Sequence, residues 1–261
     1  MEDIRFDQFI SGVEIYSVTQ CKSTQTLCVS LLENKLKSFN YPSISSNSVA
    51  VFTYNQTNGV GQAANIWESQ PGKNLAYTLG FVPDDSINLI HLNKALSLAV
   101  CKTIQSFVSH NAKIKWPNDI YVNAKKVAGL LFQVQSVANQ KIVLLGVGVN
   151  VNQIDWPIHL PNAASLCDFA NQEIFIPQLI NELTNQLTVF LNLLRDKNRN
   201  ISEMFRHELW GLQEKRNLYI ADSQNTVQVE IIDVDEFGRI VVAFENGEIH
   251  RFHHGQAFIR V

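Results

Sequence analysis

The sequence has few charged residues and no excess of positive charge. Only 17% of its 261 residues are charged, and 21 Lys and Arg against 24 Asp and Glu leave a formal net charge of −3. A protein that binds nucleic acid through its overall charge needs a clearly basic balance. The composition therefore argues against that class of protein, although it allows a local basic patch.

Amide side chains supply much of the polarity that charges do not. The chain holds 25 Asn and 18 Gln. Hyperthermophile proteins tend instead towards Lys and Glu with few thermolabile amides. We therefore expect a source that lives at moderate or low temperature.

The sequence also lacks the marks of a secreted, membrane-spanning or zinc-binding protein. Residues 1–10 carry four charges and no apolar stretch of a signal peptide, and no apolar run approaches the ~18 residues of a membrane span. The four cysteines form no C-x-x-C pair and no zinc spacing with histidine. We expect buried thiols in a reducing compartment, and hence a soluble cytoplasmic protein without a membrane partner.

Hydrophobic residues make up 46% of the chain, which is enough for a sizeable core. Apolar spacing predicts strands and helices mixed along the first four fifths of the sequence. The predicted strands are 13–18, 49–54, 74–82, 113–116, 120–122, 127–134 and 142–151, and the predicted helices are 27–36, 89–108, 177–194 and 202–212.

The last part of the chain has a different pattern. From about residue 217, five short strand-like runs are separated by turn signals, which predicts a small all-β barrel. We therefore divide the chain into domains 1–213 and 214–261. The second stretch holds five positive and eight negative residues, which argues against a nucleic-acid-binding barrel.

A loop is predicted at residues 55–72, with the sequence NQTNGVGQAANIWESQPG. Loops of this length inside a domain are usually functional or disordered. Gly59 and Gly61 lack a Cβ, so their backbone N–H groups can approach a phosphate or carboxylate closely. A lone G-x-G is a weak signal, however, and an ordinary flexible surface loop explains it equally well.

A second segment, Lys115-Trp116-Pro117-Asn118-Asp119, precedes a predicted hairpin. An amide at Asn118 suits a base edge, and a carboxylate at Asp119 suits a cation. Lys126, across the hairpin, places positive charge where two anionic reactants could meet. A turn rich in turn formers and a solvated strand lysine are the alternatives.

A third segment, residues 146–152 with the sequence GVGVNVN, places glycines and Asn150 in an apolar strand. Glycine in a strand marks the close approach of a ligand or another backbone, and a buried amide needs a partner. The alternative is a bulge with satisfied amides.

Taken together and in order, these segments resemble the biotin–protein ligase family. The most specific match is KWPNDIYVNAKKVAGLL at 115–131, followed by residues 146–152. Ser23, Thr24 and Gln25 are similar to the family's S-T-N, residues 56–67 lie where its glycine-rich biotin loop belongs, and residues 164–166 look like its T-S-L. The resemblance covers nearly the whole chain. It implies an α+β fold, with a mixed-sheet, class II synthetase-like catalytic domain and a small SH3-like barrel.

The resemblance implies an enzyme, a biotin–[acetyl-CoA-carboxylase] ligase. Such ligases make biotinyl-5′-AMP from biotin and ATP and then pass biotin to a lysine of a biotin carboxyl carrier protein or domain. The implied biotin site consists of Ser23, Thr24, Gln25, Gln56, Gly59, Gly61, Gln62, Lys126, Gly129 and Gly148.

The implied ATP site consists of Trp67, Asn118, Asp119, Lys126 and Asn150. Lys126 is the implied catalytic cation between the biotin carboxylate and the α-phosphate, where a fixed charge stabilises the transition state. Asp119 is the implied Mg²⁺ ligand, and it is also a candidate base for the carrier lysine.

The glycine-rich loop departs from the family pattern. The family reads approximately G-R-G-R-x-G-R-x-W, whereas residues 59–67 read GVGQAANIW and contain no arginine. Each lost charge-assisted hydrogen bond is worth ~1.5–3 kcal/mol. We therefore predict slow ligation or leaky release of the adenylate. Lys73 and Lys22 are candidates for the missing charge.

Other functions stay open at this point. One is a degenerate relative that binds biotin or nucleotide with weak or no catalysis. A lipoate or octanoyl transferase is another, and the KWPND segment and the C-terminal strands speak against it. Only 22 residues precede Ser23, which leaves no room for the DNA-binding domain of repressor members, so DNA is not an expected partner. Family members that dimerise through a sheet edge make a homodimer an option.

Overall fold

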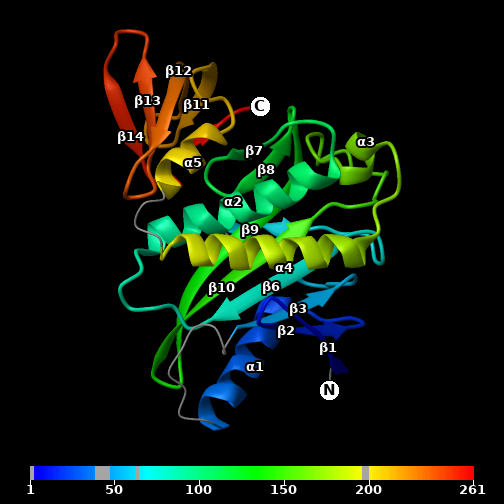
Figure 1. Cartoon of the computed structure of the whole chain (residues 1–261). Coiled ribbons are helices and arrows are strands. Elements are labelled where there is room, and N and C mark those ends of the chain that lie inside the picture. The colour runs from blue at the N-terminus through cyan, green and yellow to red at the C-terminus, as the bar shows by residue number, and fades with distance from the viewer. Residues whose placement is uncertain (1–2, 39–47, 63–64, 196–199) are drawn as a thin grey trace.

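The computed structural model describes residues 3–38, 48–62, 65–195 and 200–261. Within them the chain forms one large sheet, helices on both of its faces, and a separate C-terminal sheet (Figure 1). The helices are α1 (Thr24–Ser38), α2 (Leu89–Phe107), α3 (Leu166–Ala170), α4 (Ile176–Leu193) and α5 (Ile201–His207). The strands are β1 (Ile4–Ile10), β2 (Val13–Val18), β3 (Val49–Thr53), β4 (Gly59–Val60), β5 (Ile66–Trp67), β6 (Leu75–Phe81), β7 (Ala112–Lys115), β8 (Asp119–Val122), β9 (Lys125–Val137), β10 (Gln140–Val149), β11 (Lys215–Ile220), β12 (Asn225–Val234), β13 (Ile240–Phe244), β14 (Ile249–Phe252) and β15 (Ala257–Ile259).

The large sheet has eight strands in the order β1-β2-β3-β6-β10-β9-β8-β7. Its neighbours are antiparallel except for β2 and β3, so the sheet is mixed. Alternate residues of β3 enter two cores: Ala50 and Phe52 join the larger one and Val49 and Val51 the smaller. A strand buried on both faces reads as a continuous apolar run, as 49–54 does in the sequence.

Helices cover the two faces of this sheet because each has an apolar side. α2 and α4 pack against each other over the larger core, and α1 packs on β3 and β6 over the smaller core. The start of α2 is fixed by Asn88, whose side-chain oxygen accepts hydrogen bonds from the backbone N–H groups of Ile90 and His91. None of the helices in the described residues is long and apolar enough to cross a membrane.

The five predicted C-terminal strands are present as β11–β15. They form an antiparallel sheet in the order β14-β13-β12-β11-β15. Among residues 214–261, all of which are described, no ladder joins β14 to β15, so the strands form an open sheet rather than the closed barrel we expected. The domain boundary at 213/214 stays a prediction.

Hydrogen bonds hold the C-terminal sheet against the larger one. Trp116 donates its indole N–H to the backbone oxygen of Gly238 at 3.0 Å, and Lys94 of α2 donates to the oxygen of Val234 at 2.7 Å. Arg206 of α5 donates to the oxygen of Ile232 at 3.1 Å. The sheet therefore has a fixed place next to residues 115–119.

Three local predictions differ from the structure. The predicted helix 202–212 ends at His207, because the chain then runs beside β7, where Ile114 exchanges backbone hydrogen bonds with Glu208 and Trp210. The loop 55–72 contains the two-residue strands β4 and β5, and edge strand β1 lacks the apolar alternation that would have revealed it.

Candidate functional site

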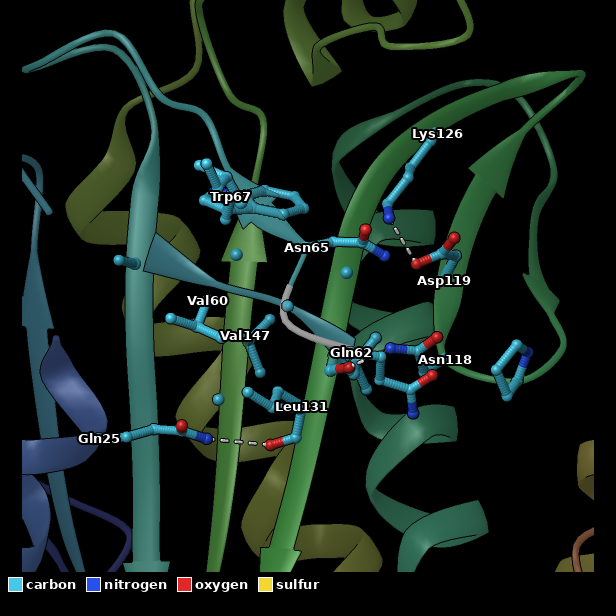
Figure 2. Close-up of a pocket in the computed structure, with 18 of the residues that line it drawn as sticks. Gln25, Val60, Gln62, Asn65, Trp67, Asn118, Asp119, Lys126, Leu131 and Val147 are labelled. Carbon is cyan, nitrogen blue, oxygen red and sulfur yellow. Dashed lines mark hydrogen bonds and ion pairs between the residues drawn. The ribbon is translucent and has the colours of Figure 1, made fainter. Parts of the chain in front are cut away.

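One pocket collects most of the residues that the sequence predicts for the site. It opens where β6, β9 and β10 meet the segment between β3 and β6, and residues 115–119 and the C-terminal sheet close it. Figure 2 shows Lys126 and Asp119 on one side and the loop residues Val60, Asn65 and Trp67 on the other. All predicted biotin and nucleotide residues line this pocket except Gly59 and Asn150.

One end of the pocket is polar and already hydrogen-bonded. The Gln56 side-chain oxygen accepts from the Thr24 backbone N–H at 2.9 Å and from the Thr24 hydroxyl at 3.2 Å. The Thr24 hydroxyl also lies 2.8 Å from that of Thr78 on β6, a residue that sequence reasoning missed. These contacts bring the predicted Ser23-Thr24 and Gln56 groups into one corner, as expected.

Gln25 lies flat against the sheet next to this corner. Its amide donates to the backbone oxygen of Leu131 at 3.1 Å, as Figure 2 shows. A Cβ on Gly146 would lie 2.8 Å from the Gln25 amide nitrogen. The glycine on β10 is therefore what lets the amide cross the strand.

Two further glycines form a flat floor for an aromatic ring. Gly148 on β10 and Gly129 on β9 are opposite each other in the antiparallel ladder. A Cβ on Gly148 would lie 2.4 Å from Cε2 of Trp67, and one on Gly129 would lie 2.9 Å from Cζ3 of the same ring. We predicted that both glycines make room for biotin, but in this structure the indole of Trp67 takes that room.

The charged pair of the pocket lies at the start of the β8–β9 hairpin. Lys126 Nζ is 2.7 Å from Asp119 Oδ1, and the two side chains are 32% and 18% exposed. The ammonium group also lies 5.6 Å from the centre of the Trp67 ring. The predicted catalytic cation, the candidate base and the ring of the predicted ATP-site residue Trp67 thus lie together.

The backbone of Lys126 is fixed by the segment that follows β10. Its N–H donates to the oxygen of Asn162 at 2.7 Å, and its oxygen accepts from the N–H of Ala164 at 3.0 Å. Asn150 reinforces this contact, since its amide donates to the backbone oxygens of Lys126 and Ala164. Asn150 is buried behind the pocket and positions Lys126, while its side-chain oxygen has no hydrogen-bond partner among the described residues. Its role at the nucleotide stays a prediction.

Gly59 also acts from outside the pocket. A Cβ there would lie 2.8 Å from the backbone oxygen of Trp67 and 2.9 Å from the amide of Gln56. The absent side chain is what lets β4 pair with β5 and so positions Trp67.

Asn118 is held by β9 through both its backbone and its side chain. Its amide donates to the oxygen of Leu130, and its own backbone oxygen accepts from the Leu130 N–H at 2.8 Å. The side-chain oxygen makes no hydrogen bond to any described residue. It is an available acceptor in the pocket for an N–H donor of a ligand.

The described loop residues that line the pocket carry no charge, and their polar side chains are amides. Gln62 and Asn65 line it at positions where the family pattern has arginine. Beyond them, Glu68 pairs with His159 at 2.6 Å and ties the end of β5 to the segment after β10. Neither Lys22 nor Lys73, our candidates for the missing charge, lines the pocket.

The C-terminal sheet and β7 supply pocket residues that sequence reasoning missed. These are Lys115 at the end of β7, and His254 and Phe258 from the C-terminal sheet and its preceding turn. Burial lowers the pKa of His254 below its usual value, against an opposing effect of the Asp119 charge. Lys115 begins the KWPND segment, but only the packing of the two sheets shows that it lies at a pocket.

Asp119 is the single carboxylate among the pocket residues. No group of three His, Cys, Asp or Glu side chains suited to a metal occurs in the part of the chain that the structure describes. Mg²⁺ typically uses one or two carboxylates together with substrate phosphates. The donor set therefore fits a metal that arrives on a nucleotide and does not fit a resident metal centre.

Comparison with known proteins places the chain in one family. The pattern of the biotin/lipoate A/B protein ligase family matches residues 17–150. Among curated proteins, the bifunctional ligase/repressor BirA of Bacillus subtilis is 35% identical over 124 residues, which are 46% of this chain and 38% of that protein. Biotin–protein ligase 2 of Arabidopsis thaliana is 28% identical over 200 residues, 74% of this chain and 59% of that protein.

Solved structures agree in fold. The biotin protein ligase of Aquifex aeolicus, in complex with biotin and ATP, superposes with a TM-score of 0.69 at 23% identity over 94% of this chain and 98% of that one. A biotin protein ligase-like protein of unknown function from Silicibacter superposes with a TM-score of 0.68 at 10% identity over 94% and 96%.

The chain belongs to the biotin/lipoate A/B protein ligase family. It spans less than two thirds of the length of the B. subtilis and A. thaliana relatives.

Proposed function

We propose that this protein joins biotin to a lysine of a biotin carboxyl carrier domain in two steps, with biotin and MgATP as substrates. The observation that carries the proposal is the meeting of Lys126, Asp119 and the Trp67 ring beside a polar corner built from Thr24 and Gln56. One end of the pocket suits a neutral polar head group, and the other suits two anions.

In the first step a carboxylate oxygen of biotin attacks the α-phosphorus of ATP. An O–P bond forms and pyrophosphate leaves. The biotin carboxylate and the α-phosphate are both negative and repel each other as they approach. A fixed cation at Lys126 therefore stabilises the transition state more than it stabilises the two separate groups. Asp119, 2.7 Å away, holds the Lys126 ammonium in place through an ion pair.

In the second step the amine of a carrier lysine attacks the acyl carbon of the adenylate. An amide bond forms, AMP leaves, and the amine loses a proton. Asp119 is the candidate acceptor for that proton at the pocket. Trp67, seated on Gly129 and Gly148, is the proposed cover for the adenine, and Asn118 is its proposed hydrogen-bond partner.

A second candidate is a relative that binds biotin or nucleotide but turns over slowly or not at all. One observation favours it: Gln62 and Asn65 face the pocket without charge where the family pattern has anion-binding arginines. The intact Lys126–Asp119 pair favours the active ligase.

The test is an assay of the purified protein with biotin, MgATP and a biotin carrier domain. Adenylate formation is followed by pyrophosphate release and ligation by mass of the carrier. We expect both, at a rate below that of an arginine-bearing ligase. Calorimetry separates the candidates: binding of biotin without pyrophosphate release supports the binder, and binding of neither biotin nor ATP refutes both.

A further inference from the structure

The pocket keeps one positive charge that no carboxylate neutralises. Its charged side chains are Lys115, Lys126 and Asp119, with His254 as the remaining titratable group. Lys126 is paired with Asp119 at 2.7 Å. Lys115 forms no ion pair within 4 Å and no side-chain hydrogen bond with any residue that the structure describes.

The position of Lys115 makes its positive charge unfavourable in the protein without a bound ligand. It is the last residue of β7 and is half-buried, with its ammonium 5.4 Å from the centre of the Tyr121 ring. Burial lowers its pKa, and the positive charges of Lys126 and Arg260 act in the same direction while Asp119 opposes them. An anion bound next to Lys115 offsets the free-energy cost of desolvating its charge and the repulsion from the neighbouring positive charges.

We propose that Lys115 binds the β- and γ-phosphates of the nucleotide, where the glycine-rich loop supplies no arginine. The inference rests on the proposed function, since it assigns a role within the same pocket. Lys126 is then left to the α-phosphate and the biotin carboxylate, and Lys115 holds the departing pyrophosphate. The charge comes from strand β7 instead of the loop.

The geometry of the hairpin supports this division of work. Lys115 and Asp119 are opposite each other in the β7–β8 ladder, and Asp119 bonds Lys126 from the other side. The two lysines therefore flank one carboxylate. A polyphosphate carries enough negative charge to contact both, and each charge-assisted contact is stronger than a neutral one.

The experiment measures binding of MgATP, Mg-pyrophosphate and biotin to the full chain by calorimetry. Three variants are compared with the wild type: Lys115→Met, Lys115→Arg and Lys73→Met. Lys73 is a matched control because it lies near the same loop but outside the pocket. Circular dichroism and thermal unfolding check that each variant is folded.

We expect Lys115→Met to weaken MgATP and Mg-pyrophosphate about tenfold to a hundredfold, the ratio for loss of one charge-assisted hydrogen bond. Biotin affinity stays within about twofold, Lys115→Arg restores most of the phosphate affinity, and Lys73→Met behaves as wild type. If Lys115→Met does not fold, Lys115→Gln, which keeps a long side chain without the charge, is measured in its place and must show the same loss of phosphate binding.

Several outcomes overturn the inference. They are undiminished pyrophosphate binding by Lys115→Met, an equal loss of biotin affinity, loss of phosphate binding in Lys73→Met alone, or a wild-type protein that binds no pyrophosphate. Failure of the proposed function looks different: the wild type then binds pyrophosphate through Lys115 but releases none from ATP and biotin.

Discussion

The two walls of the pocket are built in opposite ways. The wall formed by β7, β8 and β9 carries the charged side chains, and backbone ladders fix the residues that bear them. Lys115 is opposite Asp119 in the β7–β8 ladder, and Asp119 is opposite Gly129 in the β8–β9 ladder. The wall formed by the loop carries no charge. Gln62 and Asn65 of this loop line the pocket. Its described residues form two short strands, β4 and β5.

The two walls therefore suit different tasks: the strand wall positions the reacting charges, and the loop wall covers the ligand. The backbone of a paired strand keeps its position when the pocket is empty, because moving it breaks ladder hydrogen bonds, so the side chains it carries start from fixed points. A loop is the part of a fold that moves most readily. We infer that the strand wall performs the reaction and that the loop mainly closes over the ligand. The predictions below test that division.

The largest effect is expected for Lys126→Ala, because it removes the cation at the reacting groups. Adenylate formation should fall about a hundredfold or more, as when a transition-state donor is removed, while the fold is retained. Pyrophosphate release is the measurement. Lys125→Ala is the matched control, since this neighbour is exposed and donates to the backbone of Pro161. Undiminished release by Lys126→Ala removes the lysine from the mechanism.

The next effect concerns the glycine floor. A Cβ on Gly148 meets the rigid indole of Trp67 at 2.4 Å, whereas one on Gly146 meets the movable end of Gln25 at 2.8 Å. Gly148→Ala should therefore displace the ring and raise the KM for ATP by about tenfold, the equivalent of roughly 1.4 kcal/mol. Gly146→Ala should change it little. Equal effects of the two substitutions would contradict a stacking role for Trp67.

Positive charge added to the loop tests whether the uncharged loop wall limits the rate. The double variant Gln62→Arg with Asn65→Arg should raise the rate of adenylate formation by about tenfold, if each arginine contributes like one charge-assisted hydrogen bond that is partly screened. Single-turnover kinetics measure this rate. Asn65→Glu is the control and should lower it. No gain from the double variant would show that the strand wall already supplies the charge that the reaction needs.

The smallest effect is expected for the pair between Glu68 and His159. Their side chains are 41% and 60% exposed, and exposed pairs contribute about 0–1 kcal/mol. His159→Gln should raise the KM for ATP less than about fivefold and leave kcat unchanged, because the pair holds only the end of the loop. The exchange of the two residues, Glu68→His with His159→Glu, should restore the wild-type value.

Much of the site was predictable because its signals are local. Residues 115–131 predict a hairpin with Lys126 across it from Asp119, and the structure has that hairpin, with the two side chains 2.7 Å apart. Glycines in an apolar strand predict a close approach, and Gly146 and Gly148 each leave room for a side chain. The mixed sheet and the C-terminal strands were also predicted, and they are confirmed.

Other features depend on contacts between segments far apart in the sequence. The helix predicted to 212 ends at His207, because bonding to Ile114 at the sheet edge is available only once the sheet exists. Asn150 was expected at the nucleotide, and local signals did not indicate that its amide also binds the backbone oxygens of residues 126 and 164 behind Lys126. The sequence likewise did not predict that the indole of Trp67 lies against Gly129 and Gly148.

The sequence by itself determined most of the helices and strands and the residue types that a ligase-like site needs, because apolar periodicity and short motifs act within a few residues of chain. The mixed sheet was implied by the family resemblance. Only the tertiary structure decided which charges share the pocket. Lys115 and His254 are 139 positions apart in the sequence, and no local pattern links them. Both line the pocket because the C-terminal sheet docks on residues 115–119 through Trp116, which brings the exposed His254 to the same pocket as the half-buried Lys115 and Asp119.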